Sequence, residues 1–285
     1  MTALPEAVPE PECARPAVGG DTSNIPGFAD QQGPAETIGI RTAGVVVPAR
    51  NEESRLPRCL DALVTAKTAF QERHPVGPAV RIIVVVDLST DRTLHVAEQW
   101  PGIEVVLSDC GRVGAARAAG VDHLLASEAH RGHSPSSVWI ACTDADSAVP
   151  GDWLVHHLRT ASRGAQMILG TVRPDAGEVQ VAVLEDWRRR HVLGDGHPHI
   201  RGANLGLRGD IYRAAGGFDD AAVDEDVLFV HAVRAAGGVV VSSGASPVLT
   251  SARTEGRAAG GFAHYLRALH QQRNGIGDQF PGWAG

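Results

Sequence analysis

The acidic pair Asp144 and Asp146 is the feature of the sequence with the most evident chemical use. Only Ala145 separates the two aspartates, and the pair directly follows a mainly apolar run at residues 137–143. Two carboxylates at this spacing on a tight turn can both reach one divalent cation, and oxygen ligands suit Mg²⁺ or Mn²⁺ shared with substrate phosphates. The structural interpretation is that an aspartate after a strand caps the next helix, which is expected to begin near Pro150.

A second acidic position, Asp87, ends the apolar run at residues 82–86 and precedes a polar turn. A buried carboxylate there can accept hydrogen bonds from a nucleobase edge or a ribose hydroxyl. Asp91, a few residues later, has a structural explanation, because Thr90 or Asp91 is a natural cap for the helix that follows. We therefore expect ligand binding at Asp87 rather than at Asp91.

A third acidic group, residues 224–226, opens a segment at residues 227–236 in which apolar residues have helical spacing. Carboxylates at a helix start are favoured by the helix dipole, which is the structural interpretation. The functional alternative is a general base, because deprotonating an acceptor hydroxyl needs a carboxylate within hydrogen-bond reach. Both interpretations of Glu225 and Asp226 stay open at this point.

Three histidines, His191, His197 and His199, flank or occupy a segment rich in Gly, Pro and Asp at residues 194–199. Their spacing does not match a zinc site, which needs ligands arranged around one centre. The composition is typical of a loop, and we interpret the segment as a lid or an acceptor-binding loop.

The elements that must position these groups alternate between strand and helix patterns. Apolar, β-branched runs predict strands, and apolar residues at helical spacing predict helices. Strands are expected at residues 44–47, 80–86, 103–107 and 137–143, and helices at residues 54–70, with Ser54 as a cap, 91–99 and 114–127. This alternation predicts a parallel sheet with helices on both faces, in which ligands bind beyond the carboxyl ends of the strands.

The alternation weakens after Asp152, although helix and strand patterns continue at residues 153–163, 167–172 and 178–190. Residues 1–41 are rich in Pro, Gly, Ala and Glu without an apolar period, which predicts a disordered N-terminal tail. We expect one continuous domain at residues 42–285 with two functional halves, about 42–150 and about 151–285.

The amino-acid composition limits the classes of function that the protein can have. The chain has 285 residues, 43% of them hydrophobic, and a formal net charge of −7, so a folded core is expected and nucleic-acid binding is not. Four cysteines without CxxC spacing favour a reduced, cytoplasmic protein. The N-terminal residues lack the pattern of a signal peptide. A membrane-spanning helix needs about 20 apolar residues in a row, and every apolar run in the sequence is much shorter. Membrane contact, if any, is expected to be peripheral.

In order along the chain, these segments resemble the family 2 glycosyltransferases with the GT-A fold. Residues 45–52 resemble the opening strand and nucleotide-contacting loop of that family, and Asp87 aligns with the second Asp of its VDDGSTD segment. Further matches are residues 111–120 to its GxxxARNxG helix start, residues 143–147 to its metal-binding DxD, residues 201–219 to its GANxxxRR…GGFDE segment, and Glu225-Asp226 to its ED motif. The resemblance covers most of the chain.

This resemblance implies a Rossmann-like, mostly parallel α/β sheet flanked by helices, in a single domain with a nucleotide-sugar half and an acceptor half. It implies transfer of a sugar from a UDP- or GDP-sugar to a hydroxyl of an unidentified acceptor, with inversion and with Mn²⁺ or Mg²⁺ as cofactor. By position, Asp226 is the catalytic base beside Glu225, and Asp146 with Asp144 holds the metal. The residues expected to contact the nucleotide-sugar are Pro48, Arg50, Glu52, Asp87, Arg117 and Asp144.

A glycine-rich basic segment at residues 251–265 is expected to close over the diphosphate. His264 has two interpretations, an additional metal ligand as in some related GT-A enzymes or an exposed residue on an amphipathic helix. Arg112 also has two interpretations. It could add positive charge near the diphosphate, or, as is commoner for a single arginine, it could lie on a solvated helix face.

The sequence also departs from the family pattern. Val86 and Leu88 stand where the family has Asp and Gly, Ala118 stands where it has Asn, and no QxxRW follows the ED motif, which argues against a processive polysaccharide synthase. Two alternatives stay open: a GT-A-like module that binds nucleotide without turnover, and a retaining enzyme that makes a sugar-phosphoglycerate type of product. A dehydrogenase is not expected, because no GxGxxG follows the first strand.

Overall fold

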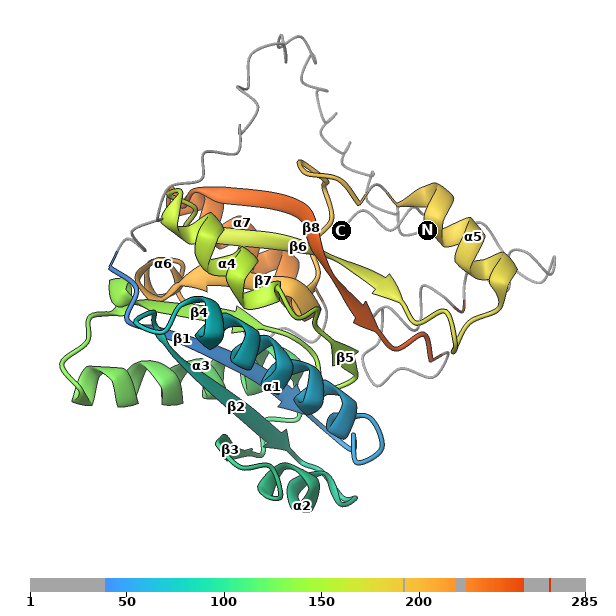
Figure 1. The fold of residues 1–285 in the computed structure, drawn as a ribbon, viewed down its shortest axis with the longest axis horizontal. Coiled ribbons are helices and arrows are strands. Elements are labelled where there is room, and N and C mark those ends of the chain that lie inside the picture. Colours follow the sequence, from blue (N-terminus) through green and yellow to red (C-terminus); the bar gives the residue numbers. More distant parts are fainter. Residues whose placement is uncertain (1–38, 192, 219–223, 254–266, 268–285) are drawn as a thin grey trace, which may run out of the picture. The chain divides into compact units, whose positions relative to one another are not determined.

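The fold is built around one eight-stranded sheet in the order β3-β2-β1-β4-β7-β6-β8-β5 (Figure 1). The computed structural model describes residues 39–191, 193–218, 224–253 and 267. The strands are β1 (Thr42–Ala49), β2 (Ala79–Asp87), β3 (Ile103–Ser108), β4 (Val138–Cys142), β5 (Ser147–Ala148), β6 (Met167–Pro174), β7 (Leu205–Arg208) and β8 (Val240–Thr250).

The sheet is mostly parallel, and one antiparallel strand, β7, joins the part that ends at β4 to the part that begins at β6. Strands β3, β2, β1 and β4 run parallel to one another, and β6 runs parallel to β8. Strand β7 is antiparallel to both β4 and β6, and the short β5 is antiparallel to β8. The expected α/β fold class is therefore confirmed, and β7 explains why the strict strand-helix alternation weakens in the second half.

Helices cover both faces of the sheet, because residues on β1 alternate between two cores. Val45 and Val47 belong to a core that includes residues of α1, α2 and α4, whereas Val46 belongs to a core on the opposite face that includes residues of α3, α6 and α7. The helices are α1 (Leu56–Arg73), α2 (Thr93–Glu98), α3 (Val113–His130), α4 (Trp153–Ser162), α5 (Val181–Arg190), α6 (Gly209–Ala214) and α7 (Glu225–Ala235).

Close packing of α3 on the sheet depends on a glycine. A Cβ added to Gly120 would lie 2.6 Å from a methyl group of Val46 and 2.7 Å from one of Val85. A larger residue would push the helix away from the sheet, and interiors at crystal-like density tolerate this poorly. The glycine thereby fixes the position of the N-terminal part of α3, which carries Arg117.

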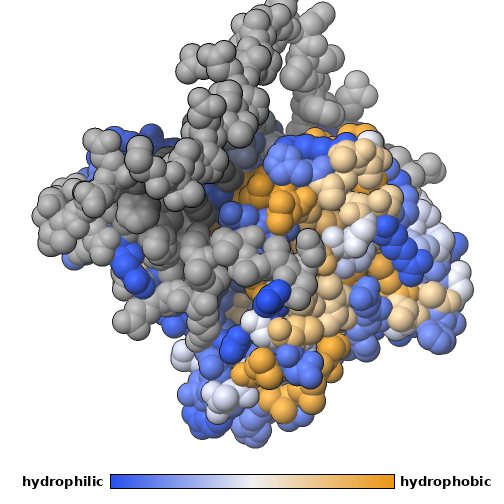
Figure 2. Space-filling model, turned by 180° about the vertical axis from the view of Figure 1, so that it is seen from behind, coloured by the Kyte–Doolittle hydropathy of each residue, from blue (hydrophilic) through white to orange (hydrophobic). Residues whose placement is uncertain are grey.

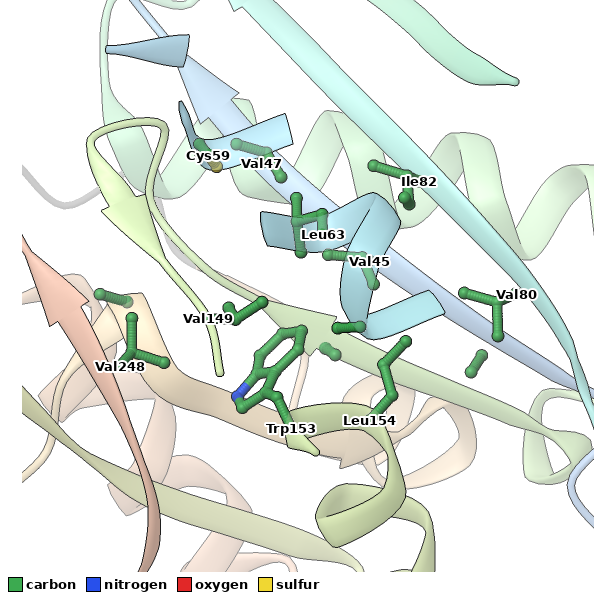
Figure 3. Close-up of a cluster of buried hydrophobic side chains, with 14 of the residues drawn as sticks. Val45, Val47, Cys59, Leu63, Val80, Ile82, Val149, Trp153, Leu154 and Val248 are labelled. Atoms are coloured by element: carbon green, nitrogen blue, oxygen red, sulfur yellow. The ribbon is translucent and has the colours of Figure 1, made fainter. Parts of the chain in front are cut away.

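The core under α1 and α4 also reaches the second half of the chain. Figure 3 shows Leu63 of α1, Trp153 of α4, Val149 and Val248 of β8 converging in this core. The Trp153 indole Nε1 donates to Asn204 Oδ1 at 2.9 Å. Asn204 Nδ2 donates to the carbonyl oxygens of Thr171 on β6 (2.8 Å) and Ser246 on β8 (3.1 Å), so this one amide ties α4 to both strands.

The expected elements are confirmed, with differences at their ends. Helix α1 begins at Leu56 with Arg55 at its N-cap and no side-chain capping bond, so the expectation that Ser54 caps it is wrong. The expected tail, residues 1–41, lies outside the described residues except for residues 39–41. Cys59, Cys110 and Cys142 are free thiols, and no described helix is long and apolar enough to cross a bilayer. The face in Figure 2 intersperses hydrophobic patches with hydrophilic residues.

Candidate active site

The DxD turn lies at the carboxyl end of β4 and does not cap a helix. The Ser147 amide donates to the Asp144 carbonyl oxygen at 3.0 Å, which closes the turn. Helix α4 begins at Trp153 with Asp152 at its N-cap, so the helix-capping interpretation of Asp144 and Asp146 is wrong. Both aspartate side chains instead form ion pairs with arginines from distant parts of the chain.

Arg117 of α3 joins the DxD turn to the start of α7. Arg117 is 2% exposed, and its guanidinium donates from Nη2 to Asp144 Oδ1 at 2.7 Å and from Nη1 to Glu225 Oε1 at 2.5 Å. Burial alone would lower the pKa of Arg117, but the two carboxylates outweigh it and raise the pKa. The guanidinium therefore stays charged and holds the two acidic groups together.

Asp226 is oriented by two backbone amides. Gly202 N–H donates to Asp226 Oδ2 at 2.8 Å, and Val227 N–H donates to Asp226 Oδ1 at 2.9 Å. An added Cβ at Gly202 would lie 2.4 Å from Arg117 Nη2, so a larger residue here would displace the guanidinium from its ion pairs. Burial and the adjacent Glu225 carboxylate raise the pKa of Asp226, although Arg117 acts in the opposite direction. A raised pKa makes the carboxylate a stronger base than an ordinary aspartate.

The second aspartate of the DxD pairs with an arginine from the segment after β8. Arg253 Nη2 lies 2.9 Å from Asp146 Oδ2, and Arg253 Nη1 lies 2.9 Å from Glu52 Oε1. Burial and the nearby Asp144 carboxylate raise the pKa of Asp146 to about 6, even with Arg253 beside it. The position thus concentrates negative charge, which is the condition under which a bound cation is stabilised.

A third acidic position lies at the carboxyl end of β2, where Asp87 is the last residue of the strand. Asp87 is buried, and its Oδ1 accepts hydrogen bonds from Ser108 Oγ (2.9 Å) and from Gly111 N–H (3.1 Å). Arg50 Nη1 donates to the Gly111 carbonyl oxygen at 3.1 Å. Among the described residues, Asp87 Oδ2 has no hydrogen-bond partner, so this oxygen remains available to a ligand.

The two loops after β1 and β2 hold one another in place. Asn51, at φ +52°, accepts a hydrogen bond from Thr90 N–H at 2.7 Å through Oδ1. Glu52 N–H donates to Thr93 Oγ1 at 2.7 Å, and Glu53 N–H donates to Asp91 Oδ2 at 3.1 Å. Because both loops are fixed before any ligand binds, Asp87 and Arg50 are pre-organised.

Leu88 occupies a backbone conformation that favours glycine. Its φ is +44° and its side chain is 46% exposed. We expect Leu88→Gly to raise the free energy of unfolding by about 0.5–1 kcal/mol, because relief of the left-handed strain exceeds the added chain entropy. Urea unfolding measures this. The matched control, Leu107→Gly in the edge strand β3, should instead lower stability; a similar loss in both variants would show that Leu88 is not strained.

The structure brings together most of the expected site residues. Arg117 links Asp144 to Glu225, the residue that precedes Asp226. Arg253 links Asp146 to Glu52. Asp87 and Arg50 form a separate group around Gly111. Pro48 is buried within β1, where it pairs with Val85. His264 and most of the segment at residues 251–265 lie outside the described residues.

Comparisons with known proteins agree with this architecture. The model of the family described as glycosyl transferase family 2 matches residues 44–211. Solved structures with a similar fold include TarS 1-349 of S. aureus in complex with UDP-GlcNAc, at 15% identity and TM-score 0.53 over 76% of this chain. Another is the mannosyltransferase PcManGT of Pyrobaculum calidifontis with GDP-Man and Mn²⁺, at 18% identity and TM-score 0.54 over 85% of this chain.

The match covers 60% of the TarS chain and 66% of the mannosyltransferase chain, so this protein spans less than two thirds of each. No curated protein matches the sequence. The family match nevertheless covers more than half of the chain and contains the DxD turn, Asp87 and Arg117. The chain therefore belongs to glycosyl transferase family 2, a family of glycosyltransferase enzymes, and has the GT-A fold.

Proposed function

We propose that this protein transfers a sugar from a nucleoside-diphosphate sugar to a hydroxyl of an acceptor, with inversion and with a divalent metal at the DxD turn. The observation that carries the proposal is the Asp144–Arg117–Glu225 network, which ties the DxD turn to the start of α7, where the basic carboxylate of Asp226 follows Glu225. A general base beside a cation site is the arrangement that an inverting displacement at a sugar carbon requires.

The donor nucleoside is proposed to bind beyond β1 and β2. Asp87 Oδ2 is available to accept a hydrogen bond from the base or the ribose. Arg50 is held nearby, because it donates to the carbonyl oxygen of Gly111, whose amide donates to Asp87. The fold is shared with structures that contain UDP-GlcNAc and GDP-Man, which supports a UDP- or GDP-sugar as donor. The side chain of Leu88, exposed beside Asp87, gives this region an apolar surface that a base can cover.

The residues of the DxD turn fit Mn²⁺ or Mg²⁺. Asp144 Oδ1 accepts from Arg117, and Asp146 accepts from Arg253 through Oδ2 and from Ser147 Oγ through Oδ1 at 3.3 Å. Each carboxylate oxygen has two lone pairs, so these partners leave acceptor capacity for a cation. The described residues contain no group of three or more acidic, His or Cys side chains that could hold a metal alone. This donor set therefore suits an ion that completes its shell with phosphate oxygens and water. When bound, the cation would neutralise charge on the departing diphosphate.

Asp226 is proposed to remove the proton from the acceptor hydroxyl. The Gly202 and Val227 amides hold both carboxylate oxygens in place, and the raised pKa keeps the group basic. Glu225 is proposed to act on Asp226 by its negative charge while Arg117 fixes its position. Arg253 adds positive charge beside Asp146, on the side where the diphosphate of the donor would lie.

The proposal is tested by incubating the protein with UDP- and GDP-sugars, with Mn²⁺ or with a chelator, and measuring release of the nucleoside diphosphate. We expect slow, Mn²⁺-dependent release without an acceptor and faster release with one. Tight nucleotide binding with no release from any donor across a broad set of acceptors would instead favour a binding module without turnover.

A further inference from the structure

Arg253 reaches the DxD turn from the far end of the described chain. Its Nη2 lies 2.9 Å from Asp146 Oδ2, and its Nη1 donates to both carboxylate oxygens of Glu52, at 2.9 and 3.2 Å. The side chain of Arg253 is 20% exposed, that of Asp146 13% and that of Glu52 6%. One guanidinium thus joins two largely buried carboxylates, and one of these is a proposed ligand of the cation.

The backbone before Arg253 is fixed beside the DxD turn. Strand β5 pairs with β8 so that Ser147 lies opposite Thr250, and Ser147 Oγ donates to Thr250 Oγ1 at 2.8 Å. The Ser251 amide donates to the Asp146 carbonyl oxygen at 3.2 Å. The pairing of β5 with β8 therefore brings Arg253 to Asp146, and the ion pair between them follows from the fold.

Glu178 provides a second attachment for the same segment. Its Oε2 accepts hydrogen bonds from Ser251 Oγ at 2.6 Å and from Ala252 N–H at 3.0 Å. From α1, Arg55 Nε adjoins its first turn and donates to Ser251 Oγ at 3.1 Å. Because the two residues before Arg253 are held in this way, a change of partner by Arg253 can be confined to its side chain.

The two ends of the Arg253 guanidinium have different partners. Nη1 contacts both oxygens of Glu52, a buried carboxylate that would be destabilised if it lost its cationic partner. Nη2 contacts Asp146. Because a guanidinium presents its donors as a rigid fork, one end can stay on Glu52 while the other changes partner. Glu52 is therefore the anchor, and the contact with Asp146 is the exchangeable one.

The positive charge of Arg253 opposes the binding of another cation at Asp146. An arginine stays charged in proteins, so the guanidinium and a divalent cation on the same carboxylate repel each other, and more strongly in a partly buried site than in water. A nucleoside diphosphate changes this balance, because its oxygens carry negative charge and accept hydrogen bonds from a guanidinium. The affinity of Asp146 for a cation should therefore depend on the diphosphate.

We propose that Arg253 makes the binding of a divalent cation at Asp146 depend on a nucleoside diphosphate, which takes over the Nη2 end of its guanidinium while Glu52 holds the Nη1 end. The inference rests on the proposed transferase function and adds the coupling between its two donor-site ligands. Glu52 is then a positioning residue that acts on the donor through Arg253. Because coupling between two ligands is reciprocal, Arg253 strengthens nucleotide binding with Mn²⁺ by the same factor.

The test measures the affinity for Mn²⁺ in the wild type and in Arg253→Gln, from the paramagnetic resonance signal of free Mn²⁺, without nucleotide and with saturating UDP or GDP. Nucleotide should tighten Mn²⁺ binding to the wild type at least about 10-fold, within the range typical of coupled sites. Arg253→Gln should bind Mn²⁺ alone at least about 5-fold more tightly than the wild type does, and the coupling should fall by a similar factor. Mn²⁺ binding that is not tightened, or coupling that is unchanged, would overturn the inference.

Two further variants separate charge from geometry. Arg92→Gln removes the same charge from an 80% exposed side chain and should leave Mn²⁺ affinity and coupling within about twofold. Arg253→Lys keeps the charge without the planar fork, so its coupling should lie between those of the wild type and Arg253→Gln. If Arg253→Gln does not fold, wild-type coupling in Arg253→Lys overturns the inference. Absence of coupling in the wild type contradicts the proposed metal site itself, and the inference fails with it, whereas coupling that survives in Arg253→Gln overturns the inference alone.

Discussion

Replacing Asp226 with asparagine is expected to lower kcat for sugar transfer by roughly 10³-fold, while nucleotide affinity changes by less than about twofold. General-base catalysis contributes about 10²–10⁴-fold, and an amide cannot take the proton of the acceptor hydroxyl. The asparagine can still accept one of the two backbone hydrogen bonds, from Gly202 or Val227, so the start of α7 should keep its position. Steady-state transfer and calorimetric nucleotide binding separate the two effects.

The matched control is Asp224→Asn, the same substitution at the exposed N-cap of α7. It should leave kcat within about twofold. In the wild type, kcat/KM should fall as the pH drops through the pKa of Asp226, and this limb should lie above the range of an ordinary aspartate because burial and Glu225 raise that pKa. The part of this limb that is due to Asp226 should be absent in Asp226→Asn, and any fall that remains reflects Asp146, whose pKa is about 6. Wild-type turnover in that variant would show that another group is the base.

Replacing Arg117 with methionine is expected to lower the free energy of unfolding by about 3–5 kcal/mol. The change removes the cation and leaves the Asp144 and Glu225 carboxylates without their partner, one of them buried. Removing one member of a buried ion pair costs this much because the remaining charge is uncompensated. Urea unfolding measures the loss, and activity should fall as well, since the DxD turn and α7 are no longer tied together.

Two further variants sharpen this prediction. Arg131→Met, at the C-cap of the same helix, removes an exposed arginine and should cost at most about 1 kcal/mol, because its buried partner Glu128 keeps Arg81 and His133. Adding Glu225→Gln to Arg117→Met should recover part of the loss, because it removes the buried unpaired charge, so the two changes should not be additive. If Arg117→Met costs no more than Arg131→Met, the network does not hold the site together.

The order of the elements and the position of the acidic residues were predictable from the sequence. Short β-branched runs that end in polar residues are a strong local signal, and they place Asp87 and Asp144 correctly at strand ends. The antiparallel β7 was not predicted, because four residues carry little periodicity. The start of α1 was misplaced, because Ser54 has the residue type of a cap but the helix begins later, at Leu56.

The long-range ion pairs could not be predicted from the sequence. The partners of Arg117 are 27 and 108 residues away, and Arg253 is 201 residues from Glu52, so no spacing rule connects them. Residue types indicated the chemistry, but only the packing of α3 on the sheet shows which charges meet.

The most direct test of the account is a titration of UDP and GDP into the wild type and Asp146→Asn, each with Mn²⁺ or with a chelator. If the DxD turn holds a cation shared with the diphosphate, Mn²⁺ should strengthen nucleotide binding to the wild type by at least about 10-fold. In Asp146→Asn this metal dependence should disappear. Nucleotide binding that is equally tight with chelator, or metal dependence that survives in Asp146→Asn, would contradict the assignment of the metal to this turn.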